Sequence, residues 1–239
     1  MLASQIHGLF TYNHLIFILL SFLLVGTLIY LSRKIEINKI KKIIKIIGII
    51  IIVLEIIKII YMIIDKRSMN DYIPLYYCSL LIYFLFLLYF NNEKTQNIGY
   101  SLIMYYGLVP SLAFIFYPIT AINFHPLISF DSLHSLIYHS LMLYLSLIIM
   151  IKKIHLVNFK DIKIYLISTL SLCLVAYLYN SIFGTILMFI NKAPHDNPIL
   201  VSLENIVGVF YPIAIALIQT IGSYIVSYYT YKFIQRRIK

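Results

Sequence analysis

The chain has 239 residues, of which 62% are hydrophobic and only 12% are charged, and its mean hydropathy is +0.91. Soluble domains typically carry about 45–50% apolar and roughly 25% charged residues, so this composition excludes a soluble globular enzyme, a disordered chain and a secreted disulfide scaffold. What remains is an all-α, polytopic membrane protein, a helical bundle that the bilayer solvates. Because a spanning helix needs about 20 apolar residues, the length leaves no room for a sizeable soluble domain.

Seven apolar segments follow one another along the chain and predict about seven transmembrane helices in a single domain over residues 1–239. The segments lie at residues 15–32, 46–64, 73–90, 98–118, 132–151, 164–190 and 206–229. Clear polar breaks separate the first six, and no fixed-period repeat or low-complexity linker divides the chain. Residues 1–11 contain no Lys or Arg and so lack the basic region of a signal peptide. We therefore expect the first segment to be retained.

The basic residues predict which way the bundle faces, because cytoplasmic loops carry an excess of Lys and Arg. With the N-terminus outside and the C-terminus in the cytoplasm, the outer loops hold only Lys66, Arg67 and Lys192 of the 19 basic residues, and Lys58 lies within a span. The net charge of +10 thus indicates the orientation of the chain in a cell membrane, and membrane lipids are the expected partners. Nucleic acid is not expected as a partner, because the chain has no basic–aromatic groove and no finger or helix-turn-helix pattern.

Charged residues within a span are costly, and they mark either structural pairing or function. Glu55 and Lys58 lie three residues apart in the second segment, so they share a helical face and can pair. One interpretation is a neutralised pair that packs the bundle. The other is the polar wall of a functional site.

A second polar group opens the fifth segment and consists of Asp131, His134 and His139. Asp131 and His134 share a helical face, so the carboxylate could accept a hydrogen bond from the imidazole and fix its tautomer. His139 lies about 140° further round the helix than His134, and Ser135 could hydrogen-bond to it. Two histidines beside an aspartate modestly favour function over packing.

The two cysteines, Cys78 and Cys173, lie in apolar runs. Neither a disulfide nor a metal-binding Cys/His spacing is expected, and no metal or cofactor is predicted. Cys78 lies about 8 Å below the outer end of its span and His139 about 10 Å below the outer end of its own; Asn180 and Tyr211 also fall in the outer half. At equal depth, a cysteine and a histidine on touching helices can form a thiolate–imidazole pair.

Three stretches of the chain resemble the YwaF-like family of bacterial integral membrane proteins. Residues 73–78, Ile-Pro-Leu-Tyr-Tyr-Cys, resemble its Leu-Pro-Leu-His-Leu-Cys stretch at the head of a span. Residues 124–139 resemble its aromatic-rich run that ends in a helix histidine, and residues 180–194 resemble its Asn–Gly–Asn-Tyr-Met-Phe-Leu segment with a following Lys-Pro. The seven-span layout also fits. Tyr76 departs from the pattern where the family often has His, and Ile186-Leu187 departs where it often has Asn-Tyr.

The YwaF-like family is similar in turn to eukaryotic membrane enzymes of lipid metabolism. These include a transmembrane acyltransferase that moves fatty acyl groups between phospholipids through a cysteine and, more distantly, the androgen-induced-gene type of fatty-acid ester hydrolases. The resemblance implies that Cys78 is a nucleophile and His139 its base. On this hypothesis the substrate is a lipid ester of the outer leaflet, His134 and Asp131 orient the base, and Asn180 stabilises the oxyanion.

Two other functions stay open at this point. A transporter or small-ligand-binding protein would use Glu55, Lys58, Asp131 and His134 as a polar cavity or proton path, although no inverted repeat or pair of broken helices is visible. A non-catalytic accessory protein would use its polar residues only to lock helices together.

Overall fold

The computed structural model describes residues 8–68, 73–158 and 161–237, and the described residues form helices, turns and loops with no β-strand. The elements, in chain order, are α1 (Tyr12–Ser32), α2 (Ile37–Ile64), α4 (Leu81–Leu85), η1 (Phe86–Tyr89), α5 (Glu93–Phe116), α6 (Phe130–Ile151), α7 (Asp161–Phe183), η2 (Leu187–Phe189), α8 (Pro198–Val207), η3 (Gly208–Phe210), α9 (Tyr211–Leu217), η4 (Ile218–Gly222) and α10 (Ser223–Arg237). The predicted all-α class is therefore confirmed.

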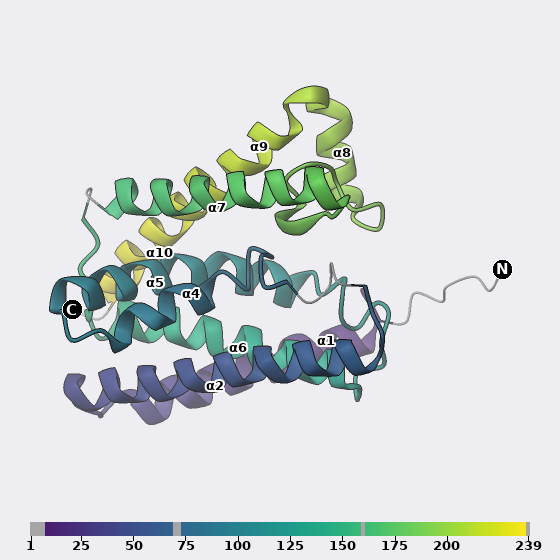
Figure 1. Ribbon diagram of the computed structural model, residues 1–239. Coiled ribbons are helices and arrows are strands. Elements are labelled where there is room, and N and C mark those ends of the chain that lie inside the picture. The colour runs from purple at the N-terminus through teal and green to yellow at the C-terminus, as the bar shows by residue number, and fades with distance from the viewer. Residues whose placement is uncertain (1–7, 69–72, 159–160, 238–239) are drawn as a thin grey trace.

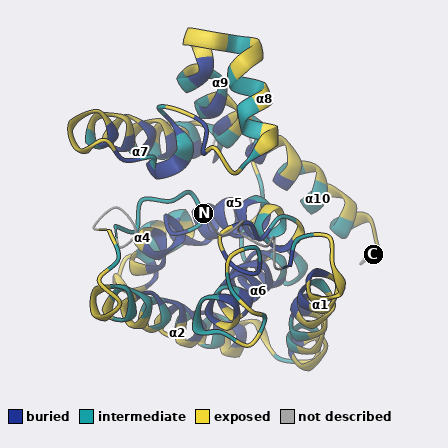
Figure 2. Cartoon of the chain, turned by 90° about the vertical axis from the view of Figure 1, so that its right-hand side faces the viewer, coloured by how far each residue is buried: buried dark blue, intermediate teal, exposed yellow. Residues whose placement is uncertain are grey.

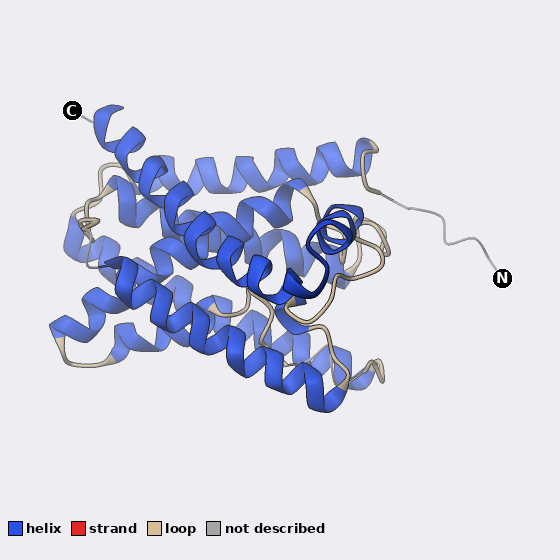
Figure 3. Cartoon of the chain, turned by 90° about the horizontal axis from the view of Figure 1, so that it is seen from above, coloured by secondary structure: helices blue, strands red, loops and turns tan. Residues whose placement is uncertain are grey.

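Five of the described elements are long and apolar enough to cross a membrane. They cover Tyr12–Ser32, Glu93–Phe116, Phe130–Ile151, Asp161–Phe183 and the interrupted stretch Pro198–Arg237. The long helices run side by side, and the loops gather at their two ends (Figure 3). These features confirm a polytopic helical membrane protein.

Side chains that can cap a helix set where several of these helices begin. Asn92 accepts hydrogen bonds from the backbone N–H groups of the first turn of α5, and Ser129 accepts one at the start of α6. Asn197 does the same for α8, where Pro198 occupies the first turn. Each cap satisfies backbone donors that have no partner within the helix.

Two layers of helices make up the structure (Figure 1). We call the elements from α1 to α6 the first layer, and those from α7 to α10, with η2, η3 and η4, the C-terminal layer. Within the first layer, α5 and α6 are largely buried, whereas α1 and α2 turn exposed apolar faces outward (Figure 2). The outward apolar residues fit contact with lipid, because hydrocarbon solvates them as well as a protein interior does.

Small residues allow α5 and α6 to pack closely at the centre of the first layer. A Cβ added at Gly107 would lie only 2.8 Å from the carbonyl oxygen of Met142. One turn away, the Ser146 hydroxyl of α6 donates to the Met104 carbonyl of α5 at 2.6 Å. The hydroxyl thus finds a partner across the helix pair, as polar groups within a membrane require.

The third apolar segment does not fold as one continuous helix. Residues 73–80, which we call the Cys78 segment, form turns, and only afterwards do α4 and the 3₁₀ turn η1 follow. Pro74 therefore lies within the turns rather than in the first turn of a helix. Irregular backbone at membrane depth is tolerated where protein covers it, and here α5 on one side and α7 on the other provide that cover.

Candidate functional site

A buried ion pair lies on α2, facing the Cys78 segment. The Lys58 ammonium donates to Glu55 Oε1 at 2.5 Å, which confirms the pairing predicted from their spacing. Glu55 is only 2% exposed, and its carboxylate also accepts a longer hydrogen bond, 3.4 Å, from the Ser79 hydroxyl. Ser79 is the residue after Cys78, so this contact joins α2 to the segment that carries the cysteine.

Cys78 is half-buried and directly precedes Ser79, so the Ser79–Glu55 contact joins the residue next to the cysteine to the ion pair. Tyr138 of α6 also lies near Ser79, with a buried hydroxyl that completes no hydrogen bond. A cation close to a thiol stabilises the thiolate, the reactive form of cysteine, and an anion opposes it. The Glu55–Lys58 pair thus brings one charge of each sign to the Cys78 segment.

His134 belongs to the same cluster. Its Nε2 lies 3.0 Å from the Leu54 carbonyl oxygen, which can only accept, so Nε2 carries the hydrogen and Nδ1 of the neutral ring holds the lone pair. The imidazole stacks on the Tyr138 ring with centroids 5.6 Å apart. His134 therefore contacts α2 at the residue before Glu55, while the Cys78 segment contacts Glu55 itself through Ser79.

The predicted Asp131–His134 hydrogen bond is wrong, because Asp131 has a different partner. Its two carboxylate oxygens accept from Nη1 and Nη2 of Arg67 at 2.8 and 2.9 Å. Asp65 accepts from Arg67 Nε at 2.7 Å, and His125 Nδ1 lies 3.6 Å from Asp131. The hydrogen bonds that Arg67 donates to Asp131 raise the pKa of the guanidinium, so the group stays cationic.

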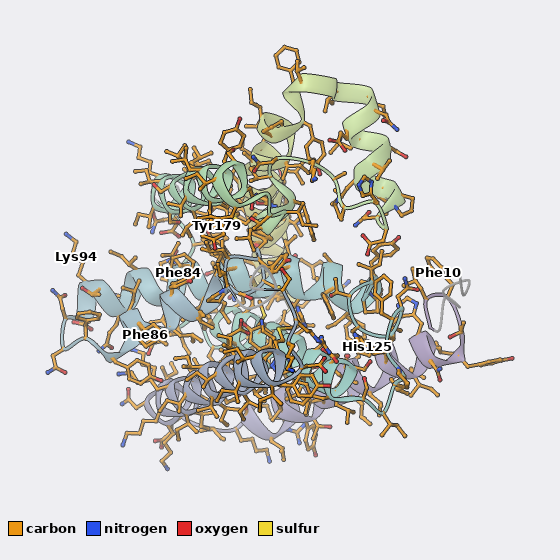
Figure 4. The ribbon with its side chains drawn as sticks, turned by 45° about the vertical axis from the view of Figure 1, so that its right-hand side comes forward. Phe10, Phe84, Phe86, Lys94, His125 and Tyr179 are labelled. Atoms are coloured by element: carbon orange, nitrogen blue, oxygen red, sulfur yellow. The ribbon has the colours of Figure 1, made fainter. Side chains whose placement is uncertain are left out.

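The ion pair between Arg67 and Asp131 joins the end of α2 to the start of α6. His125 lies at the same end of the structure as Phe10, whereas Lys94 lies at the opposite end (Figure 4). In the sequence, Arg67 stands out only as a basic residue of a predicted outer loop. Its separation of 64 positions from Asp131 left no local spacing that could have indicated the pair.

His139 faces away from the ion pair, toward α5. Its ring stacks flat on Phe114, with centroids 3.7 Å apart and planes 2° apart. Nδ1 lies 2.8 Å from the Ser135 carbonyl oxygen, so the predicted contact with Ser135 forms through the backbone. Nε2 is buried without a hydrogen-bond partner. Among the described residues, no hydrogen bond joins His139 to Cys78.

Asn180 does not have a free donor for an oxyanion, which corrects its predicted role. Its Nδ2 group donates to the Leu187 carbonyl at 2.9 Å and to Asn191 Oδ1 at 2.8 Å, which uses both amide hydrogens. Its Oδ1 accepts from the Leu187 N–H and from the Thr185 hydroxyl. Asn180 therefore fixes the loop that follows α7 against that helix.

The remaining predicted residues lie in the C-terminal layer. Tyr211 begins α9 and is buried, with a hydroxyl that has no hydrogen-bond partner. Cys173 is buried in α7, and its thiol lies 3.8 Å from Oε1 of Gln219. Over the described ranges, no group of three or more His, Cys, Asp or Glu residues is placed to hold a metal ion.

The structure is thus that of a polytopic helical membrane protein with a buried ion pair on α2. A sequence profile of the TMEM164 family matches residues 9–230, so the chain belongs to the TMEM164 family. No curated protein and no solved structure matches the chain. The resemblance to a family of membrane proteins is confirmed at this level, and the narrower YwaF-like assignment stays a prediction.

Proposed function

We propose that this protein is an intramembrane acyltransferase that carries a fatty acyl group on Cys78. The observation that carries the proposal is the contact of Ser79, the residue after Cys78, with the buried Glu55–Lys58 pair, while His134 bonds the Leu54 carbonyl directly before Glu55. A lone buried cysteine behaves as a small hydrophobe. A half-buried cysteine on a segment that a cation and an imidazole approach from α2 and α6 has instead the groups that a thiolate nucleophile uses.

The reaction would begin with transfer of the Cys78 proton to the His134 Nδ1 lone pair. The thiolate then attacks the carbonyl carbon of a lipid ester, and Lys58 stabilises the charge that develops on the carbonyl oxygen. The C–O bond breaks, and the departing alkoxide takes the proton from the imidazolium. A thioester on Cys78 and a lysolipid result.

The second half of the reaction reverses these roles. The hydroxyl of an acceptor lysolipid gives its proton to His134 and attacks the thioester carbonyl. The C–S bond breaks, which regenerates the Cys78 thiolate, and this recovers the proton from His134. Water as the acceptor would release a free fatty acid instead, so acyl transfer and hydrolysis differ only in the second nucleophile.

We infer seven passes, with the N-terminus outside and the C-terminus in the cytoplasm. In this arrangement α2 and the broken elements at residues 73–90 and 198–237 cross the bilayer in addition to the uninterrupted helices. The arrangement of the loops supports this orientation: the connections that follow α2 and α7 lie at one end of the bundle, and the α1–α2, α6–α7 and C-terminal ends lie at the other (Figure 1). The former carry Lys66, Arg67 and Lys192, and the latter carry most of the other basic residues. Cys78 then lies about 8 Å below the outer end of its pass, a depth that suits the ester groups of outer-leaflet lipids.

A thioester trap tests the proposal directly. The full chain in lipid vesicles is supplied with a phospholipid whose acyl chain carries an alkyne tag, and protein-bound label that neutral hydroxylamine releases is measured. We expect wild type and Cys173→Ser to be labelled and Cys78→Ser to remain unlabelled. Equal labelling of Cys78→Ser would refute the proposal.

Two further variants identify the base. We expect His134→Asn to slow labelling by about 10²–10⁴-fold, the range that general acid–base groups contribute, and His139→Asn to have a much smaller effect. The reverse order would assign the base to His139, whose unpartnered Nε2 can also accept a proton.

The charge pairing favours one alternative, a non-catalytic membrane protein. Glu55 is neutralised by Lys58 and Asp131 by Arg67, so both acidic groups already have structural partners. On this alternative, Cys78→Ala/His134→Ala would retain full function in cells that depend on the protein. Loss of function with normal protein abundance would instead support chemistry at Cys78.

A further inference from the structure

A single backbone carbonyl in the C-terminal layer receives side chains from two other elements. Gln219 lies in η4, a π-helical turn, and such turns release carbonyls from the regular i to i−4 pattern. The Gln219 carbonyl oxygen accepts from the Tyr77 hydroxyl at 2.8 Å and from the Tyr165 hydroxyl at 2.9 Å. The two hydroxyl oxygens are 2.6 Å apart. The hydrogens of these two hydroxyls are therefore shared among three contacts: one between the tyrosines and one from each tyrosine to the carbonyl.

The Gln219 side chain extends the same junction. Its Nε2 donates to the Met188 carbonyl at 2.9 Å, and Met188 and Phe189 both have a φ of 53°, a left-handed conformation that costs energy for residues other than glycine. The Phe189 ring packs against the Tyr76 ring, with the ring centroids 6.0 Å apart. Gln219 thus reaches Tyr77 directly and Tyr76 through Phe189.

Tyr76 and Tyr77 directly precede Cys78. Their segment is not a regular helix: the Tyr76 carbonyl accepts from the N–H groups of Ser79 and Leu80, and side-chain contacts from outside add to these turn bonds. On one side Ser79 contacts Glu55 of α2. On the other side the tyrosines contact the C-terminal layer, so the cysteine lies between two anchors.

We propose that Gln219 and Tyr77 are positioning residues for Cys78, and that the C-terminal layer sets the place of the nucleophile through them. This inference rests on the proposed role of Cys78 in acyl transfer. This positioning role also accounts for the π-helical turn. In a regular α-helix the Gln219 carbonyl would accept from a backbone N–H of its own helix, and Tyr77 would lose this carbonyl as an acceptor.

The test measures the reactivity of the Cys78 thiol itself. In a Cys173→Ser background, which keeps a donor facing Gln219, Cys78 is the chain's one thiol. The full chain in detergent is alkylated with N-ethylmaleimide over a series of pH values. Tyr77→Phe removes only the hydroxyl, and Tyr144→Phe is the matched control, because its buried hydroxyl bonds Ser32 at 2.6 Å in a part of the first layer that lacks Cys78.

We expect Tyr77→Phe to raise the alkylation rate of Cys78 by about two- to tenfold. One buried hydrogen bond changes the equilibrium between the closed segment and a segment open to the reagent by about this factor. The pH profile of alkylation should shift as well. Tyr165→Phe leaves the Tyr77–Gln219 bond in place and should give a smaller increase. Tyr144→Phe should leave the rate and profile unchanged. An unchanged rate in Tyr77→Phe, or an equal rise in Tyr144→Phe, would overturn the inference.

The alkylation result is separable from the acyltransferase proposal. If Tyr77→Phe changes alkylation but wild type never forms a thioester, the positioning contact stands and the catalytic role of Cys78 fails. If wild type forms the thioester and Tyr77→Phe alkylates like its parent, only the positioning role fails. If both hold, Tyr77→Phe should lower kcat for acyl transfer while KM changes little.

Discussion

Replacement of Lys58 by Met should destabilise the bundle more than any other single lysine replacement on α2. The ammonium donates to a carboxylate that is 2% exposed, and the only other hydrogen bond to that carboxylate in the described structure is the long one from Ser79. Loss of Lys58 would leave the Glu55 charge buried and nearly unpartnered. Removal of one partner of a buried ion pair typically costs about 3–5 kcal/mol.

Two features of this site lower that figure. The Lys58 side chain is 16% exposed, so part of the pair is accessible, and both partners lie on one helix, so the pair can persist when the helices separate. We therefore expect Lys58→Met to cost about 2–4 kcal/mol. The double variant Glu55→Gln/Lys58→Met carries no buried charge and should cost less than about 1.5 kcal/mol, since the amide can still bond Ser79.

The assay is equilibrium unfolding of the full chain in mixed detergent micelles, followed by helix content and by fluorescence. Lys58→Met, Glu55→Gln and the double variant complete a double-mutant cycle. Lys42→Met is the matched control, because Lys42 is exposed on the same helix, and its cost should stay within about 0.5 kcal/mol. If Lys58→Met matched this control, or if the double variant were as unstable as the single one, the buried-pair reasoning would be refuted.

The remaining predictions concern other contacts and use the same unfolding assay. Gly107→Ala should cost about 1–3 kcal/mol through overpacking, because its Cβ would press on a backbone carbonyl. Gly26→Ala, with nothing within 4 Å of the added Cβ, should be neutral or stabilising by up to about 1 kcal/mol. Equal effects of the two variants would contradict the close α5–α6 contact. Asp131→Asn should cost about 1–2 kcal/mol by weakening the partly exposed Arg67 fork, and a neutral result would mean that Asp65 alone suffices. Asn180→Ala should cost about 2–4 kcal/mol, because it strands the Leu187 backbone groups, and should speed proteolysis of the loop after α7.

Hydropathy predicted the class of fold because lipid solvation selects for it. Apolar runs long enough to span a bilayer have one low-energy conformation there, the helix, since only that satisfies the backbone within each segment. The same reasoning could not predict the turns at residues 73–80, because the hydropathy of that stretch matches that of a helix. The segment is instead held through the Tyr77 side chain, whose hydroxyl bonds Tyr165 of α7 and the Gln219 carbonyl, contacts that sequence spacing does not encode.

In the candidate site, too, contacts between neighbours on one helix could be predicted and contacts between distant residues could not. Glu55 and Lys58 could be paired from sequence because residues three apart on a helix are always neighbours. Asp131 and His134 have the same spacing, yet Asp131 bonds Arg67. A bidentate guanidinium offers a carboxylate two charge-assisted hydrogen bonds and a neutral imidazole only one, so the distant partner displaced the local one.

Equal depth was the weakest of the site predictions, because depth fixes one coordinate and leaves rotation about the helix free. Cys78 and His139 are predicted to lie at similar depth, but the ring of His139 stacks on Phe114 of α5. His134 lies closer to the end of α6, and its face of the helix carries Tyr138 one turn later, beside the Glu55–Lys58 pair. The angular position of a residue therefore decides which histidine can serve a cysteine on a neighbouring segment, and it assigns that role to His134 in the mechanism proposed above.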